Sequence, residues 1–177
     1  MSLLSYTEIC ELIEQEVIQG AEYENVNSAS LDIRLAGTIF AENISGRYGA
    51  ISLKKRERPN VIGYKLPYTL EPGECILASS YEIFHLPLNI SAEYKLKSSM
   101  ARIWLEHLNA GWCDAGWNGS VLTLELKNMT RNHKILLEEE DKVGQIVFFR
   151  HTPVPADKSY AVRGRYNGDT TAQGVKK

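Results

Sequence analysis

The chain has 177 residues, a formal net charge of -2, 44% hydrophobic residues and 24% charged residues. This length suits one domain better than two, and the composition is ordinary for a globular protein. A charge so close to zero provides no broad attraction to nucleic acid or to an anionic membrane, so neither is an expected partner. An anionic ligand must be held by a local cluster of donors, which fits a small metabolite better than a polymer.

The sequence also makes a prediction about location. Its apolar stretches are strand-sized, far below the roughly 20 residues that a membrane span needs. The N-terminus, Met1–Ser5, lacks the basic start and long apolar core of a signal peptide. The cysteines Cys10, Cys75 and Cys113 are widely separated and odd in number, which argues against a disulfide framework. We therefore expect a cytoplasmic protein with reduced thiols.

The first predicted element is a helix over residues 5–19. Apolar residues at helical spacing indicate it: Ile9, Leu12, Ile13 and Val17. Thr7 is expected to cap this helix and Gly20 to end it.

Beyond residue 20 the pattern changes to short β-like runs. These predicted strands are 31–35, 64–70, 74–78, 81–86, 121–126 and 145–149. Turn signals separate them at 71–73, 118–119 and 141–144. A second short helix is predicted over 98–105. Many short strands with little helix indicate a mainly β fold, a distorted jelly roll or barrel.

The end of the chain differs from the rest. Residues 163–177 contain three glycines and few apolar side chains, so we predict a flexible C-terminal tail behind a β domain of residues 1–162. Such a tail can be merely mobile or can close over a ligand, and composition does not decide between these alternatives.

The first segment whose residues could bind a ligand or take part in catalysis is 97–102. Lys97, Ser98, Ser99 and Arg102 place two cations and two hydroxyls where the second helix begins. Backbone N–H groups at a helix start, together with Lys and Arg, can bind phosphate. The alternative is a serine-capped surface helix with scattered charges.

The second candidate segment is 111–119, which is rich in glycine. The glycines, including Gly111, allow a ligand to approach the backbone closely. Asp114 could accept a sugar hydroxyl or position a metal-bound water, and Trp117 could lie against a ring or sugar. The alternative is a tight loop with structural tryptophans.

The third is the strand 121–126. Thr123, Glu125 and Lys127 share one face, and if that face lines a cleft, Glu125 is a candidate general base. A strand glutamate is more often simply solvent-facing. The four histidines are dispersed, and the H-x-E and P-C-x-x-C signatures of zinc deaminases are missing, so no zinc site is expected.

Taken together and in order, six segments resemble the dCTP deaminase and dUTPase superfamily. Residues 27–35 are similar to its early S-L-D-L-R-L strand, and 70–78 to its L-x-P-G-E hairpin. Residues 97–105 resemble R-S-S-x-A-R-x-G-L, and 114–119 resemble D-P-G-F/W-x-G. The last two segments are 123–128, similar to T-L-E-L-x-N, and 144–149, similar to G-Q-L-x-F-F.

This resemblance implies a dUTPase-like fold and a homotrimer whose active sites are shared between subunits. It implies that Glu125 is the general base, that Ser98 and Arg102 position the water and the base, and that backbone near Gly111 completes the cradle. Lys97 and Ser99 would bind a triphosphate chelated to Mg²⁺. Nucleotide contacts would also come from Asp114 on the 3′-hydroxyl, Trp117 on the sugar, and Tyr160, Arg165 and Tyr166 near the tail.

The chain departs from the family pattern at several positions. Trp104 replaces a usual glycine, and Cys113 replaces a common isoleucine. Ala115 stands where many deaminases have proline, although some bifunctional relatives share the alanine. One extra residue lies between Gly119 and Glu125, which a β-bulge could absorb. The tail over 169–173 lacks a Q-x-G-x-T motif.

Three functions follow as hypotheses. The first is zinc-independent hydrolysis of dCTP to dUTP and ammonia, supplying pyrimidine deoxynucleotides. The second is a dUTP diphosphatase, or a bifunctional enzyme that gives dUMP. The third is a non-catalytic regulator that binds nucleotide.

Overall fold

A computed structural model of the protein describes residues 1–45 and 49–176. The long strands are β3 (Leu31–Glu42), β6 (Cys75–His85), β7 (Ile90–Leu96), β10 (Asn118–Asn128) and β12 (Lys142–Arg150). The short strands are β1 (Ser2–Leu3), β2 (Ile18–Gln19), β4 (Val61–Lys65), β5 (Tyr68–Leu70), β8 (Leu105–His107), β9 (Trp112–Cys113) and β11 (Ile135–Leu137). The helices are α1 (Tyr6–Glu14), α2 (Ser98–Arg102) and α3 (Tyr160–Arg163), with single 3-10 turns η1 (Tyr23–Asn25) and η2 (Ala156–Lys158).

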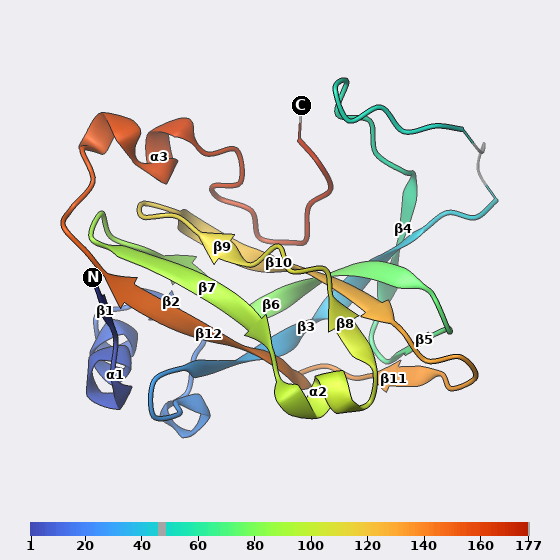
Figure 1. The fold of residues 1–177 in the computed structure, drawn as a ribbon, viewed down its shortest axis with the longest axis horizontal. Helices are drawn as coiled ribbons and strands as arrows, with labels where there is room; N and C mark the ends of the chain where they lie inside the picture. The colour runs from blue at the N-terminus through green and yellow to red at the C-terminus, as the bar shows by residue number, and fades with distance from the viewer. Residues whose placement is uncertain (46–48, 177) are drawn as a thin grey trace.

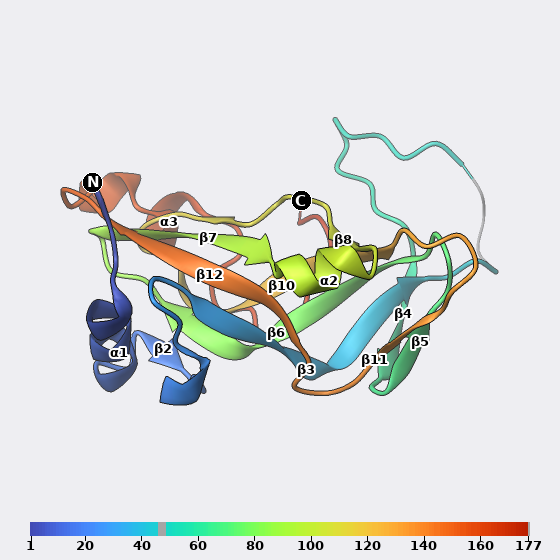
Figure 2. The same ribbon diagram turned by 60° about the horizontal axis from the view of Figure 1, so that its bottom comes forward.

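Most strands belong to one antiparallel sheet that follows the path β8–β10–β6–β3–β12–β7–β9. Off this path, β1 pairs with β12, β2 with β6 and β4 with β3, and β5 and β11 form a separate small ladder. Figures 1 and 2 show that the sheet curls, with β7 and β12 on one side and β3 and β6 continuing around the other. Fully buried side chains fill the inside of this half-barrel, among them Leu31, Ile33, Phe84, Tyr94 and Phe148. The predicted mainly β, barrel-like fold is confirmed.

The first helix differs from its prediction at both ends. α1 begins after Ser5, whose backbone N–H and hydroxyl both donate to the Glu8 carboxylate, at 3.0 and 2.9 Å. Ser5, and not Thr7, is therefore the N-cap, in an S-x-x-E capping box. The helix ends at Glu14 because Ile18 and Gln19 pair with β6, so Gly20 lies beyond it and does not terminate it.

Several predicted boundaries also change. Runs 74–78 and 81–86 are one strand, β6, while 64–70 is divided into β4 and β5 around Pro67, which has no N–H for a ladder. The predicted turn at 118–119 lies inside β10, and the one at 141–144 overlaps the start of β12. α2 stops at Arg102, because β8 begins three residues later. β7 is an additional strand that was not predicted.

A buried ionic cluster ties the sheet together where β3, β6 and the loop before β12 meet. Arg34 is 3% exposed, and its Nε donates to Glu82 Oε1 at 2.9 Å. Its Nη1 reaches Glu22 and Glu140 at 3.1 and 2.9 Å, and its guanidinium lies 4.4 Å from the Tyr81 ring centroid. A buried charge is tolerated only when it is paired in this way, so Arg34 has a structural role.

Among the helices of the described residues, none is long and apolar enough to cross a membrane.

Candidate active site

A cavity of about 710 Å³ lies between β10, the segment around β9 and the C-terminal segment. This volume is in the range of about 300–1,000 Å³ that is typical of small-molecule sites. Six of the predicted site residues line it: Gly111, Asp114, Trp117, Glu125, Tyr160 and Tyr166.

Glu125 is placed in the cavity by β10, where it pairs opposite Leu77 of β6. Its neighbours Leu124 and Leu126 are buried in the core, so strand alternation turns Glu125 to the cavity side. Its Oε2 atom is buried without a hydrogen-bond partner among the described residues. Burial raises the pKa of the Glu125 carboxyl, because desolvation penalises the charged form. An unpaired carboxyl in this environment is suited to take up and return a proton.

β10 pairs irregularly with β6 ahead of Glu125; that a bulge absorbs the extra residue of this chain stays a prediction. Asn118 pairs with His85 and Ser120 with Phe84, so two steps on β10 match one step on β6. A second shift lies between Val121 and Thr123. From Thr123 onward the register is regular, so the bulges precede the stretch of strand that carries Glu125.

Only glycine fits at position 111, because the backbone of β7 lies too close for a side chain. A Cβ atom there would lie 2.5 Å from the Tyr94 carbonyl oxygen, and the Tyr94 N–H donates to the Gly111 oxygen at 2.8 Å. The backbone at Gly111 therefore passes directly against β7 and faces the cavity. The neighbouring Cys113 is buried, and desolvation raises the pKa of its thiol to about 12. Cys113 thus stays protonated and is a small packing residue, not a nucleophile.

The loop from Asp114 to Trp117 packs a structural tryptophan and also borders the cavity, while its contact with a ligand stays a prediction. Trp117 is 6% exposed, and its ring is stacked 5.5 Å from Phe84, which makes it part of the core. Its indole N–H donates to the Tyr166 carbonyl at 2.8 Å, and one edge borders the cavity. Asp114 is exposed in the cavity wall and accepts the Trp112 indole N–H at 2.9 Å.

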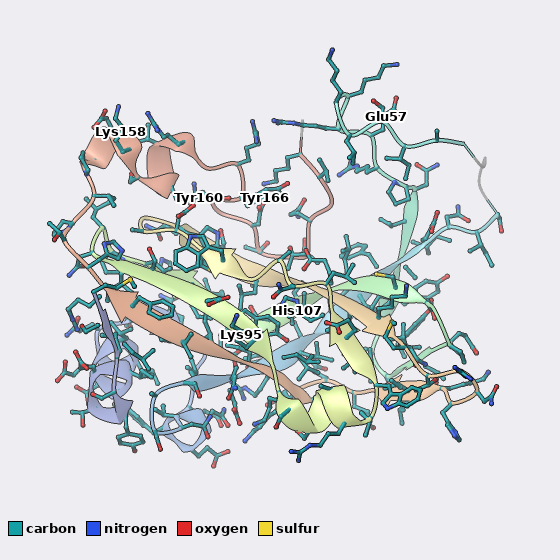
Figure 3. The ribbon with its side chains drawn as sticks, in the orientation of Figure 1. Glu57, Lys95, His107, Lys158, Tyr160 and Tyr166 are labelled. Atoms are coloured by element: carbon teal, nitrogen blue, oxygen red, sulfur yellow. The ribbon has the colours of Figure 1, made fainter. Side chains whose placement is uncertain are left out.

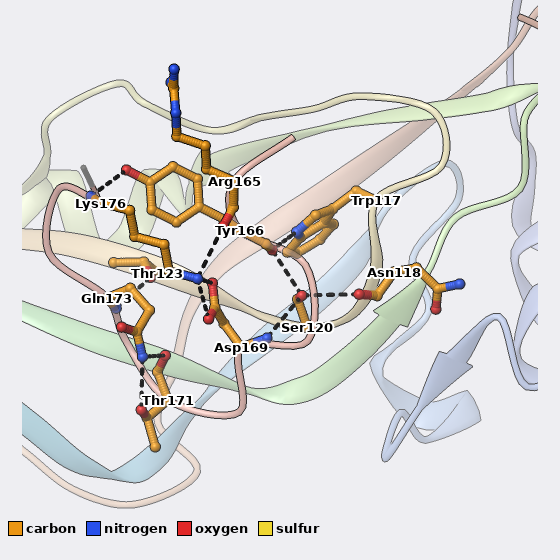
Figure 4. A network of polar contacts seen from close by, with 10 residues as sticks. All are labelled: Trp117, Asn118, Ser120, Thr123, Arg165, Tyr166, Asp169, Thr171, Gln173 and Lys176. Atoms are coloured by element: carbon orange, nitrogen blue, oxygen red, sulfur yellow. Dashed lines mark hydrogen bonds and ion pairs between the residues drawn. The ribbon is translucent and has the colours of Figure 1, made fainter. Parts of the chain in front are cut away.

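The C-terminal segment lies along β10 and forms one wall of the cavity (Figure 4). The Val121 N–H donates to the Asp169 carbonyl at 2.9 Å, and the Gln173 N–H donates to Thr123 Oγ1 at 3.1 Å. Ala172 is 6% exposed and its N–H donates to Ser79 Oγ at 2.7 Å. These contacts place the tail beside Glu125; its flexibility and its closure over a nucleotide stay predictions.

One cation and one carboxylate of the tail form an ion pair with each other. Lys176 Nζ contacts both carboxylate oxygens of Asp169, at 2.5 and 2.7 Å, and lies 5.3 Å from the Tyr166 ring centroid. Arg165, in contrast, is exposed and does not line the cavity.

The residues of α2 and its N-cap are not brought to this cavity within one chain. None of the four predicted residues Lys97, Ser98, Ser99 and Arg102 lines it, and α2 lies at the edge of the molecule away from the tail (Figure 1). Lys97 Nζ contacts Asp32 Oδ2 at 2.5 Å, and the other three side chains are exposed. Arg102 instead borders a second hollow with Trp104 and residues 130–136.

The charge of the cavity wall is unfavourable for a polyphosphate. Five carboxylates line it: Glu42, Glu57, Asp114, Glu125 and Asp169. Arg58 is the one Lys or Arg among the described lining residues. A triphosphate bound here therefore needs further cations from outside this wall.

One lining region was not predicted from the sequence, the loop around Arg58. It matches none of the family motifs. The sequence did carry one signal, because Lys54 to Arg58 contains four cations in five positions.

No group of three His, Cys, Asp or Glu side chains in residues 1–45 and 49–176 is arranged to hold a metal ion. The absence of a zinc ion from the reaction stays a prediction.

A curled antiparallel half-barrel with a cavity beside the C-terminal segment defines a dUTPase-like architecture. A 2′-deoxycytidine 5′-triphosphate deaminase from Agrobacterium tumefaciens superposes with a TM-score of 0.66 at 24% identity, over 82% of this chain and 48% of that chain. A dUTPase from Streptococcus mutans superposes with a TM-score of 0.51 at 16% identity, over 77% of this chain and 88% of that chain. At these identities the likeness shows the fold.

Sequence comparison identifies the family. The model of the dCTP deaminase-like family matches residues 3–151. A relative from Nanoarchaeum equitans is 36% identical, over 88% of this chain and 87% of its own length, and one from Aquifex aeolicus is 32% identical, over 94% and 89%. Both relatives are named dCTP deaminase, dUMP-forming. The chain therefore belongs to the dCTP deaminase-like family.

Proposed function

We propose that this protein is a hydrolase that deaminates dCTP. Water adds to C4 of the cytosine, the C–N bond to the amino group breaks, and dUTP and ammonia are released. The observation that carries the proposal is the buried, unpartnered Glu125 Oε2 in the cavity wall. The names of the curated relatives support the choice of substrate.

Glu125 is the proposed proton carrier of this reaction. Its carboxylate takes a proton from water as the water oxygen bonds to C4, and the resulting carboxyl returns a proton to the departing amino nitrogen. The raised pKa supports both steps, because it makes the carboxylate a better base and the carboxyl a stable intermediate state. The backbone at Gly111 would hold the pyrimidine edge, and Asp114 the 3′-hydroxyl.

Mg²⁺ is proposed to arrive with the triphosphate. It prefers oxygen ligands, keeps several waters and is usually bound through substrate phosphates and one or two carboxylates. The exposed Asp114 carboxylate in the cavity wall fits contact with that water shell. Mg²⁺ would neutralise part of the phosphate charge, which the five carboxylates of the wall otherwise oppose.

We further propose a homotrimer in which α2 of one subunit completes the cavity of another. The charges support this arrangement, since the cavity wall has five carboxylates and one cation. Lys97, Ser98, Ser99 and Arg102 of a second copy would supply two cations and two hydroxyls to the triphosphate and the attacking water.

A second candidate extends the reaction to dUMP. Both named relatives are dUMP-forming, and Ala115 after Asp114 is shared with some bifunctional enzymes. In this scheme a second water, positioned by Asp114, attacks the phosphate chain of the dUTP, and dUMP and pyrophosphate leave.

Chromatography of the products after incubation with dCTP and Mg²⁺ tests these proposals together. dUTP with ammonia would support the deaminase, and dUMP with pyrophosphate would support the bifunctional enzyme. Unchanged dCTP, together with tight nucleotide binding measured by calorimetry, would contradict both and favour the regulator.

A further inference from the structure

The loop that connects β3 to β4 forms a wall of the cavity opposite the tail. Its described part, residues 49–60, projects above β4, where Glu57 is labelled in Figure 3. Its lining residues are Ile51, Leu53, Glu57, Arg58 and Pro59. The loop therefore adds a surface to the site that none of the family-like segments provides.

Hydrogen bonds within the loop hold it in a defined shape. The Glu57 N–H donates to the Ser52 carbonyl at 3.1 Å, and the Ser52 N–H donates back to Glu57 Oε2 at 2.8 Å. Pro59 restricts the residue before it to extended backbone. The carboxylate of Glu57 is thus hydrogen-bonded within its own loop. The backbone on both sides of Arg58 is therefore restrained, by these hydrogen bonds and by Pro59.

Arg58 lies against the tail with its guanidinium free. A Cβ atom at Gly174 would lie 3.2 Å from Arg58 Cδ and 3.6 Å from Nη1, so the missing side chain of Gly174 leaves room for the arginine. Within residues 1–45 and 49–176 the Arg58 guanidinium has neither an ion pair nor a hydrogen bond. Lys176, the nearby tail cation, is bound by Asp169.

We propose that Arg58 binds the phosphate chain of the nucleotide and makes the site selective for a nucleoside polyphosphate. This inference rests on the proposed function of the cavity. A planar guanidinium with free donors matches phosphate oxygens in a bidentate manner. Because Arg58 lines the same subunit's cavity as Glu125, it provides a cation there in addition to those that α2 of a second copy would bring.

The test is the affinity for dCTP, measured by calorimetry in a Glu125→Gln background that does not turn the nucleotide over. Arg58→Gln is expected to weaken dCTP binding by about 10- to 100-fold, the usual effect of removing a charge-assisted hydrogen bond. Arg58→Lys should recover part of that loss. Lys158→Gln, a matched loss of charge at an exposed site distant from Glu57 in Figure 3, should bind within about twofold of the parent.

The melting temperature without ligand separates binding from a structural role. Arg58→Gln should have the same melting temperature as the parent, because the Arg58 guanidinium makes no ion pair or hydrogen bond within the described residues. Unchanged dCTP affinity would overturn the inference. The inference would also be overturned if the Gln and Lys variants lost the same amount of dCTP affinity and both melted at a lower temperature. That result would mean that Arg58 stabilises the tail and does not bind phosphate. If the parent itself neither binds dCTP nor, as wild type, converts it, the proposed function has failed and the inference falls with it.

Discussion

The cavity around Glu125 and the surface around α2 differ in charge and in completeness. The cavity has a buried acid, a wall of carboxylates and a single cation. The hollow beside α2 is lined by Arg102, Arg131, His133 and Lys134, with no carboxylate among its described lining residues. Under the proposed homotrimer, each region would supply what the other lacks to a site for an anionic nucleotide. Association of subunits would join these complementary halves.

The largest expected effect comes from Glu125 in the first half. Glu125→Gln preserves the shape of the side chain but removes the proton carrier, so the rate of ammonia release from dCTP should fall by about 10²–10⁴-fold. Glu106→Gln, on the adjacent strand β8, is the control, because Glu106 is exposed and lines neither hollow. Deamination by Glu125→Gln at the normal rate would remove Glu125 from the mechanism.

The next prediction concerns the joining of the two halves. Glu125→Gln and Arg102→Ala should each be inactive, yet coexpressed subunits should regain activity. With random mixing, about one site in four combines an intact cavity with an intact α2, so roughly a quarter of wild-type activity is expected. Ammonia release from purified mixed oligomers measures it. No recovery, in oligomers shown to contain both variants, would mean that both residues act within one subunit's site.

Local features of the fold could be predicted because they depend on neighbours in sequence. The alternation in 31–35 and 121–126 correctly indicates strands β3 and β10, since each apolar face must be buried. The cap of α1 could have been predicted as well, because Ser5 and Glu8 form an S-x-x-E pattern. β7 has the same kind of signal, with Ile90, Ala92, Tyr94 and Leu96 in alternation.

The rest of the site could not be predicted because it depends on contacts that are distant in sequence. Ala172 donates to Ser79 across 93 positions, and Arg58 meets Gly174 across the cavity mouth. No local pattern specifies such pairs. The order of motifs likewise suggested that Arg102 and Glu125 act together, but it contains no information on whether they meet in one chain or between two.

A smaller effect is expected from the pH dependence of stability. Burial raises the pKa of Glu125 above its ordinary value of 4.5 in the folded state. The stability linked to the protonated folded carboxyl is therefore fully present below the unfolded pKa and is lost as the pH rises through the folded pKa. Glu125→Gln cannot ionise, so its melting temperature should exceed that of wild type at pH 8.

Thermal unfolding at two pH values checks this sign. At pH 8 the melting temperature of Glu125→Gln should lie above that of the wild type, because the wild-type protein must keep a charged carboxylate in a desolvated site. At pH 4, below the ordinary pKa of 4.5, the two melting temperatures should lie closer together, because the wild-type carboxyl is then mostly protonated in both states. An equal offset at both pH values would show that burial of the charge is not its cause.

The smallest effect concerns Trp104, at the end of α2. Trp104 has a φ of 66°, a left-handed conformation that favours glycine, and the residue is 56% exposed. That conformation costs a non-glycine residue about 1–2 kcal/mol, and glycine gives back about 0.5–1 kcal/mol through its flexible unfolded chain. Both Trp104→Gly and Trp104→Ala lose the ring, and only glycine relieves the strain, so Trp104→Gly should melt at most a few degrees above Trp104→Ala.

The same variant tests whether the α2 surface is covered in the assembly. In a single chain, removing the ring of Trp104 loses only the contacts of its covered part, because the residue is 56% exposed. If a second subunit packs on it, the lost apolar contact outweighs the relief of strain, and Trp104→Gly would dissociate more readily on dilution in sedimentation experiments. A higher melting temperature with unchanged association would instead place Trp104 outside the subunit contact, and the contribution of α2 to a neighbouring cavity would then be confined to its first turn, where Ser98 and Ser99 lie.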